Sequence, residues 1–383
     1  MKEKIVFINQ STGYLMIDIV NAFASQCQET VLIAGSIKQD ERNLAKSTRI
    51  DKIIKYNKKS SIKRLFTWVW GTIQIFFKLL FKYRGWHVVY VTNPPMSYLL
   101  SKFLKNHFSI IIFDTYPDAL RNIGIKKGNV IYNLWSKWNK KIFSKANNIF
   151  TLSEGMAQQL TTYTDRENIT VIPLWAASES FKPIEKKDNP FVKQHNLHDK
   201  FVVMYSGNMG YTHNVDTLAT VARELKDNSK IHFLFIGDGK KKNEIISFVK
   251  DNNLNNCTFL DWQPFKALPY SLASADIGVV TLNEETALTS VPSKTFNLMA
   301  VGSPLLCITT QQSEIAKIVD KYHNGFVCPA TDVDKITSFI KNLADNKTLK
   351  QEMSNSSLVA SKEFTYKNAK LYFDTLKHTM YSK

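Results

Sequence analysis

The chain has 383 residues, of which 44% are hydrophobic and 22% charged, and it contains 24 Phe, 15 Tyr and 7 Trp. This composition excludes a disordered chain, and the length predicts two hydrophobic cores rather than one. The four cysteines form no CxxC pair, which argues against a zinc site or a redox motif and favours a reducing compartment.

The formal net charge of +17 is concentrated in the first half. Residues 1–180 hold 25 Lys and Arg against 12 Asp and Glu, whereas residues 181–383 hold 25 against 21. A basic half favours an anionic partner. Charge alone does not tell whether this partner is a membrane surface, a nucleic acid or a phosphate-bearing acceptor. The sequence has no recognisable nucleic-acid-binding module, so we expect no nucleic acid partner. Because no signal peptide precedes the first strand pattern, we expect a cytoplasmic protein.

Short apolar runs alternate with helical patterns along the first 180 residues. A helix is predicted from about Leu15, and strands are predicted at KIVFIN, TVLIAG, HVVYVT, SIIIFD, NNIFTLS and NITVIP. Strands that are separated by helices predict a parallel sheet.

Residues 62–84 are the most apolar and aromatic segment, with basic residues at both ends. A membrane-spanning helix is disfavoured because Gln74 and Lys78 interrupt the apolar run. Two interpretations stay open. The segment is either a helix packed on its own domain, or an interfacial helix whose aromatic residues enter lipid while its basic ends meet anionic head groups. The aromatic residues concerned are Trp68, Trp70, Phe76, Phe77 and Phe81. The basic, aromatic segment 131–145 favours the interfacial helix.

The second half repeats the same rhythm. One helix is predicted at about 214–226, and a second helix is predicted to end near 252. Strands are predicted at KFVVMYSG, IHFLFIGDG, CTFLDW, ADIGVVTL, SPLLCIT and GFVCP. The polar stretch within 174–200 contains Pro183 and Pro190 and is typical of a linker. We therefore predict two doubly wound α/β domains, residues 1–180 and 181–364, which face each other across a ligand-binding cleft.

Three segments of the second half have features of a phosphate site. The turn Tyr205–Gly210 (YSGNMG) joins a strand to a helix, and glycines there let the backbone approach an anion. The turn GDG, residues 237–239, is similar. In TSVPSKTFNLMAVGSPLL, Ser293 and Lys294 stand at the start of a helix, where a lysine could neutralise a diphosphate leaving group. Each of these features also occurs as an ordinary turn or helix start.

Five segments of the second half carry a resemblance to a known family. In chain order they are YSGNMG with Asp216, FIGDG, CTFLDWQPFKALPYSLASADIGVVTL, VPSKTFNLMAVGSPLL and NGFVCP. They resemble the donor half of the retaining family-four glycosyltransferases with the GT-B fold, in the branch that makes bacterial surface polysaccharides. Weaker matches are QSTGY, TNPPMS, FDTYPD, FSKANNIFTLSEGMAQQL and VIPLW. The likeness is strong from about 200 to 330 and loose before 180. In this fold a C-terminal helix, here 365–383, packs back on the first domain.

The resemblance implies transfer of a sugar from a nucleotide diphosphate, usually uridine, with retention of the anomeric configuration and without a metal or other cofactor. In similar enzymes positive side chains and helix amides stabilise the departing diphosphate. The implied donor residues are Gly207, Asn208 and Gly210 in the diphosphate loop, Lys294 with Ser293 at the phosphates, Asp238 and Gly239 beside them, and Trp262 with Gln263 at the nucleobase. Thr289, Ser290 and Asn297 are further candidates for donor binding.

The sequence departs from the family pattern at two places. Many relatives have two glutamates eight positions apart, where this chain has Thr289 and Asn297; Glu284 and Glu285 are nearby, and a solvated loop pair is the simpler interpretation of them. Relatives also often have an arginine and a lysine after the first strand of the second domain, where this chain has GNMGYTHNVD. These departures leave Lys294 as the main cation.

On the acceptor side, Asp114 and Asp118 of FDTYPD follow a strand, and either is a candidate for orienting or deprotonating an acceptor hydroxyl. Gly13 and Tyr14, in the loop after the first strand, are candidates for acceptor binding. The leading hypothesis is a transferase that acts on a polyprenyl-diphosphate-linked saccharide at the inner face of the plasma membrane. The alternative is a nucleotide-sugar epimerase of the same fold, which would need neither an acceptor nor a basic, aromatic surface.

Overall fold

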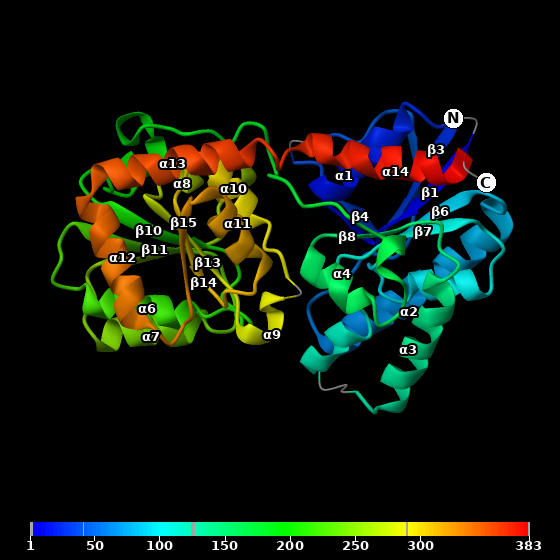
Figure 1. Cartoon of the computed structure of the whole chain (residues 1–383), viewed down its shortest axis with the longest axis horizontal. Helices are drawn as coiled ribbons and strands as arrows, with labels where there is room; N and C mark the ends of the chain where they lie inside the picture. Colours follow the sequence, from blue (N-terminus) through cyan, green and yellow to red (C-terminus); the bar gives the residue numbers. More distant parts are fainter. Residues whose placement is uncertain (1–2, 41, 124–126, 289, 382–383) are drawn as a thin grey trace. The chain divides into compact units, whose positions relative to one another are not determined.

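A computed structural model describes residues 3–40, 42–123, 127–288 and 290–381. The chain divides into two compact units (Figure 1). Unit 1 comprises Met1–Pro173 and Tyr366–Lys383, and unit 2 comprises Leu174–Thr365. Each unit is built on its own parallel sheet, which confirms the predicted α/β class.

The sheet of unit 1 has the strand order β5-β3-β1-β6-β7-β8-β9. Its strands are β1 (Lys4–Ile8), β3 (Glu29–Ala34), β5 (Thr48–Lys52), β6 (His87–Val91), β7 (Phe108–Ile111), β8 (Ile149–Thr151) and β9 (Ile169–Val171), and β2 (Ser11–Thr12) pairs with β4 (Ser36–Ile37). After Lys4 and His87 at their starts, the central strands β1 and β6 are apolar, because both faces of a parallel sheet are buried. Strand β5 (TRIDK) was not predicted: it is a charged, largely exposed edge strand without an apolar run.

The helices of unit 1 are α1 (Tyr14–Ala24), α2 (Ser61–Phe77), α3 (Val130–Phe143), α4 (Glu154–Leu160) and α14 (Ala369–Tyr381). The C-terminal helix α14 lies along α1 (Figure 1). The ring of Phe373 meets that of Phe23 edge to face, with centroids 5.2 Å apart. Asn148, just before β8, donates a hydrogen bond to Thr379 (2.8 Å). The last helix is therefore part of the core of unit 1.

The sheet of unit 2 has the order β12-β11-β10-β13-β14-β15. Its strands are β10 (Phe201–Ser206), β11 (Ile231–Ile236), β12 (Cys257–Leu260), β13 (Ile277–Thr281), β14 (Leu305–Ile308) and β15 (Gly325–Cys328). Its helices are α5 (Pro190–Gln194), α6 (Val215–Glu224), α7 (Lys242–Asp251), α8 (Leu268–Leu272), α9 (Glu284–Ala287), α10 (Lys294–Ala300), α11 (Glu314–Tyr322), α12 (Val333–Asp345) and α13 (Lys347–Ser361).

Both sheets reverse their winding direction once. In unit 1 the chain winds outward from β1 through β3 to β5, and on the other side from β6 through β7 to β9; in unit 2 the corresponding pair is β10 and β13. Ligands of doubly wound sheets bind at the carboxyl ends of the strands beside such a switch point. The fold therefore marks one binding edge in each unit.

Candidate functional site

The loops that follow β10 and β11 pack directly on each other. Met209 donates its amide hydrogen to the carbonyl of Asp238 (2.8 Å), and Lys241 donates to the carbonyl of Met209 (2.9 Å). Gly237 and Gly239 have φ values of +129° and +155°, which favour glycine, and a Cβ on Gly237 would collide with the carbonyl oxygen of Gly207. The two glycine turns predicted from the sequence thus form one structure at the switch point of unit 2.

Lys294 brings a positive charge to this structure. Its side-chain nitrogen is buried without a hydrogen-bond partner and lies 3.8 Å from the centre of the Tyr205 ring, although part of the residue remains accessible. A Cβ on Gly207 would lie only 2.5 Å from this nitrogen. Burial lowers the pKa of Lys294 to about 7. A buried ammonium group that lacks a hydrogen-bonding acceptor is suited to receive an anion.

Two neighbours of Lys294 were not assigned a role from the sequence. The hydroxyl of Tyr205 donates to the carbonyl of Asn208 (2.6 Å), so its ring both fixes the glycine loop and lies under the ammonium group. Burial, and then the charge of Lys294, lower the pKa of His213 to about 4, so this imidazole is neutral near pH 7. Both residues lie within or beside the YSGNMG motif, but a sequence motif does not tell which way their side chains point.

The other predicted donor residues follow the neighbouring strands. Asn208 and Asp238 are exposed at the two glycine loops, and Gly210 lies beside the amide group of Asn208. Trp262 follows β12 with 57% of its surface exposed, and Gln263 donates to the carbonyl of Asp261 (3.0 Å). Because β10, β11 and β12 are adjacent and parallel, these residues share one edge of the sheet.

The remaining candidates of unit 2 lie between β13 and α10. Ser290 and Ser293 are half-buried, and Ser293 immediately precedes α10, while Thr289 lies outside the described residues. Asn297 accepts a hydrogen bond from the amide of Ala177 (2.8 Å), so its amide group holds the start of unit 2 against α10. Glu284 and Glu285 are exposed at the start of the short helix α9.

Unit 1 has a pocket of about 250 Å³ at its own switch point. It lies at the carboxyl ends of β1, β6 and β7 and brings together Gly13, Tyr14 and Asp114, three of the residues predicted for the acceptor. Gly13 precedes α1, and a Cβ added to it would meet nothing within 4 Å. The backbone at Gly13 is therefore open to a ligand.

The two aspartates of FDTYPD have different surroundings. Asp114 lines the pocket, and its amide, like that of Phe113, donates to the hydroxyl of Thr92 (3.1 Å each). Asp114 as a residue keeps solvent-exposed surface, while burial of its carboxyl group raises the pKa of that group. Asp118 instead accepts the hydroxyls of Tyr132 (2.6 Å) and Tyr163 (3.0 Å), one on each carboxylate oxygen. Asp114 is therefore the more accessible of the two for a substrate.

Helix α2 continues into a π-helical turn at Lys78–Lys82, and together they expose one apolar face and pack the other on unit 1. Thr67, Gly71, Ile75 and Leu79, spaced four residues apart, are buried. The exposed apolar residues are Ile62, Leu65, Phe66, Val69, Trp70, Ile73, Phe77, Leu80 and Phe81. Of the aromatic residues predicted to enter lipid, Trp68 and Phe76 are only half-exposed, and Trp68 stacks on Tyr56 with centroids 5.8 Å apart.

Within the described ranges, no cluster of three or more His, Cys, Asp or Glu residues is arranged to hold a metal ion. Within the same ranges, no helix combines the length and the apolarity needed to cross a bilayer.

Comparison with known proteins relates the second unit to a known family and the chain to curated relatives. Residues 186–358 match the family of glycosyl transferases group 1. The matched segment lies within unit 2. It is 26% identical, over 72% of each chain, to the "Probable glycosyltransferase WbjE" of Pseudomonas aeruginosa. It is 25% identical, over 61% of this chain and 59% of the relative, to the "Putative colanic acid biosynthesis glycosyl transferase WcaI" of Escherichia coli K12.

A solved structure agrees with the fold of this glycosyltransferase. HepE of Anabaena, in complex with UDP and glucose, matches with a TM-score of 0.73 at 14% identity over the full length of both chains. With the two parallel sheets, this likeness confirms the predicted GT-B fold.

Proposed function

We propose that this glycosyltransferase moves a sugar from a UDP-sugar to a lipid-linked saccharide in the synthesis of a bacterial surface polysaccharide, with retention of the anomeric configuration. The observation that carries the proposal is the buried nitrogen of Lys294, which lacks a hydrogen-bonding acceptor and lies against the Gly207 loop. The names of WbjE and WcaI support a glycosyltransferase of polysaccharide synthesis, and the UDP complex of HepE supports the donor.

Lys294 supplies the positive charge that the departing diphosphate needs. As the bond from sugar to phosphate breaks, the diphosphate gains charge and the sugar becomes oxocarbenium-like, so a fixed cation stabilises the transition state more than the ground state. The glycines let the two loops and the end of Lys294 pack closely together, and Trp262 offers an exposed aromatic face for the base. We propose that this side chain takes the place of a metal ion.

Unit 1 binds the acceptor in this proposal. The pocket at Gly13 and Tyr14 has a single carboxylate, Asp114, among its lining residues. A carboxylate with a raised pKa is suited to accept a proton from an attacking hydroxyl. Asp118, whose oxygens accept two tyrosine hydroxyls, holds α3 and the residues after α4 in place around the segment that carries Asp114.

The exposed face of α2 is the proposed contact with an anionic membrane. Large apolar residues such as Phe66, Phe77 and Phe81 are 52% to 76% exposed there. The basic residues nearby in sequence are Lys58, Lys59, Lys63, Arg64, Lys82 and Arg84. An apolar face bordered by basic side chains binds the interface of a bilayer that contains anionic lipids. Gln10, which lies between the pocket residues Asn9 and Ser11, donates a hydrogen bond to the carbonyl of Thr67 (2.8 Å), so this part of α2 lies beside the acceptor pocket.

The proposal is tested with a panel of nucleotide sugars. Thermal stabilisation identifies the donor, and release of the nucleotide diphosphate is then measured with and without a polyprenyl-diphosphate-linked saccharide. We expect one UDP-sugar to give release that depends on the acceptor. Conversion of the donor sugar without any acceptor would instead identify an epimerase and contradict the proposal.

A further inference from the structure

Unit 2 holds a second cavity at the edge of the sheet where the strands begin. It has a volume of about 570 Å³, within the range of small-molecule sites. Its walls include Phe201 at the start of β10, Asp276 and Pro304 just before β13 and β14, and the first turns of α13. Because the strands are parallel, this edge is opposite the one that carries Gly207 and Lys294.

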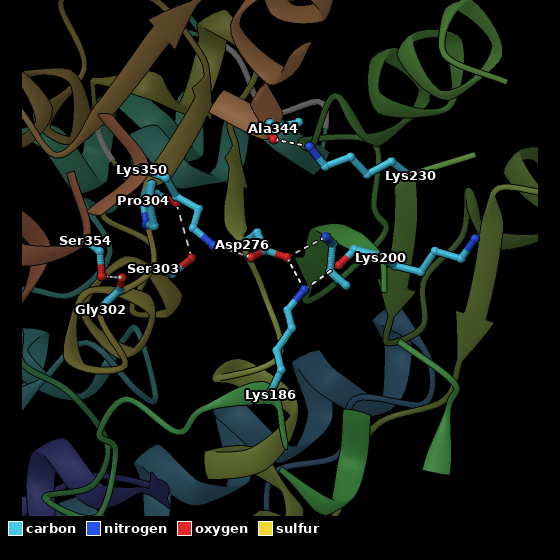
Figure 2. Close-up of polar contacts among 11 residues, drawn as sticks. Lys186, Lys200, Lys230, Asp276, Gly302, Ser303, Pro304, Ala344, Lys350 and Ser354 are labelled. Atoms are coloured by element: carbon cyan, nitrogen blue, oxygen red, sulfur yellow. Dashed lines mark hydrogen bonds and ion pairs between the residues drawn. The ribbon is translucent and has the colours of Figure 1, made fainter. Parts of the chain in front are cut away.

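Asp276 is the buried acid of this cavity, with only 6% of its side chain exposed. Lys186 lies 2.5 Å and Lys350 2.8 Å from its two carboxylate oxygens, and Figure 2 shows the two lysines reaching it from different sides. The amide of Val202 also donates to this carboxylate (2.8 Å). One negative charge thus meets two positive charges, which leaves an excess of one at the centre of the cavity.

Lys200 adds to this excess, whereas the charge of Lys230 is paired with an acid outside the lining. Lys200 donates a side-chain hydrogen to the carbonyl of Ser229 (2.8 Å), while Lys230 donates to the carbonyl of Ala344 (Figure 2) and also pairs with the carboxylate of Asp345 (3.3 Å). A carbonyl oxygen accepts a hydrogen bond but does not neutralise an ammonium charge, and each ammonium group has three hydrogens to donate. The lining contains five lysines against three acids: Lys186, Lys200, Lys230, Lys347 and Lys350 against Glu185, Asp199 and Asp276.

The start of α13 gives an independent indication of an anion. This helix has 15 residues, and its first turn contains no acidic residue but begins with Lys347, followed one turn later by Lys350. The helix dipole places a partial positive charge at this end, where acids are favoured and lysines are disfavoured. Two lysines at this end are therefore unfavourable for an isolated helix, and a bound anion would reverse the effect.

We propose that this cavity binds a phosphate-bearing anion, with Lys347 and Lys350 of α13 and Lys186 as its cationic contacts. Flexible ammonium groups from separate elements suit phosphate oxygens, which accept several charge-assisted hydrogen bonds. The site is separate from the donor loops and does not depend on the function proposed above. A cluster that only fastens α13 to the sheet would give the same ion pairs at Asp276 but would not bind an anion.

The first test is chemical footprinting of lysines on the intact wild-type protein. Acetylation of each lysine is quantified by mass spectrometry with inorganic phosphate, pyrophosphate, a hexose phosphate or sodium chloride at equal ionic strength. We expect the phosphate compounds to slow the acetylation of Lys347 and Lys350 at least threefold, with no change at exposed Lys226 and Lys250. Stronger protection by the hexose phosphate would identify an esterified ligand, and equal protection a free phosphate. Equal labelling in all four solutions would overturn the proposal.

Variants then separate anion binding from a structural role. In calorimetric titrations with pyrophosphate, Lys347→Gln/Lys350→Gln should lose the binding component of this site or weaken it at least tenfold, whereas Lys226→Gln/Lys250→Gln, with the same change in charge, should retain it. Asp276→Asn, which removes the competing negative charge, should tighten it severalfold. If the double variant does not fold, Lys347→Gln alone, at an exposed position, should still weaken binding. Unchanged pyrophosphate binding in the lysine variants would contradict the proposal.

Discussion

The ammonium nitrogen of Lys294 lies 3.8 Å from the centre of the Tyr205 ring, and the hydroxyl of the same tyrosine donates to the carbonyl of Asn208. The side chain of Tyr205 therefore contacts both Lys294, which is the cation assigned to the leaving group, and the glycine loop that would hold the phosphates. The ring face offsets part of the cost of burying this charge. An anionic ligand is needed to offset the rest.

Replacement of Lys294 by Met should stabilise the ligand-free protein. Burial lowers the pKa of this lysine from 10.5 to about 7, which corresponds to a penalty for the charged form of about 5 kcal/mol. Met has a similar length and no charge, so the free energy of unfolding in urea should rise by about 1–2 kcal/mol while the affinity for UDP falls at least a hundredfold. Lys250→Met, at an exposed position, is the control. A loss of stability with unchanged UDP affinity would refute the assignment.

Binding of UDP should take up a proton above about pH 7. The folded pKa of Lys294, about 7, lies below its usual 10.5, so the free protein loses this proton as the pH rises through 7, and a bound diphosphate raises the pKa again. Affinity should therefore decrease from pH 7 to pH 9. Titration calorimetry at pH 8 in buffers of different ionisation enthalpy measures the uptake. An observed enthalpy independent of the buffer would count against the role of Lys294.

The same pKa fixes the pH dependence of stability. Between about pH 7 and 10.5 the unfolded chain binds the lysine proton and the folded chain does not, so this residue makes the free energy of unfolding rise with pH in that window. The slope should be absent in Lys294→Met. Urea titrations of both proteins at pH 7.5 and 9.5 give the comparison, and an identical slope in the two would disagree with the buried charge.

Two glycines of the same loops should respond differently to alanine. A methyl group on Gly207 meets the flexible end of Lys294, so Gly207→Ala should fold normally but reduce turnover at least tenfold. A methyl group on Gly237 meets the backbone carbonyl of Gly207 at a φ of +129°, so Gly237→Ala should lose more than 2 kcal/mol of stability. Thermal unfolding and diphosphate release distinguish the two; the reverse pattern would mean that the loops pack differently.

Serine substitutions on the exposed face of α2 should release the protein from membranes. Phe66→Ser/Phe77→Ser should lower binding to vesicles with anionic lipids at least tenfold in a sedimentation assay, with little change in unfolding temperature, because both side chains are more than half exposed. Val359→Ser, an equally exposed apolar position in unit 2, should bind as wild type does. Unfolding of the α2 variant would indicate that this face packs within the protein.

The sequence predicted the strands that are buried on both faces, because their apolar runs are continuous and bounded by turns. It did not predict β5, since the exposed edge strand TRIDK carries charged residues where the central strands carry apolar ones. The sequence did not decide between the two interpretations of segment 62–84, because apolar residues occur all around its helix and hide the helical period of the buried face. The structure shows a buried face at Thr67, Gly71, Ile75 and Leu79, so that Trp68 and Phe76 lie at its border rather than on the exposed face.

The sequence predicted those residues of the site whose place follows from the order of the strands. Gly207, Gly239 and Lys294 follow neighbouring parallel strands, and such ends must meet at one edge of the sheet. The roles of Tyr205 and His213 depend on side-chain direction, which motif spacing does not specify. The cavity at Asp276 was not anticipated either, since its lysines come from the linker, two strand starts and α13, far apart in the sequence.

The most direct test of the proposed reaction is the anomeric configuration of the product, followed by proton NMR as it forms from a single UDP-sugar and a polyprenyl-diphosphate-linked saccharide. We predict a new glycosidic bond with the configuration of the donor, formed only when the acceptor is present and reduced at least a hundredfold in Lys294→Met. An inverted bond, or wild-type rates in that variant, would contradict a retaining transferase centred on Lys294.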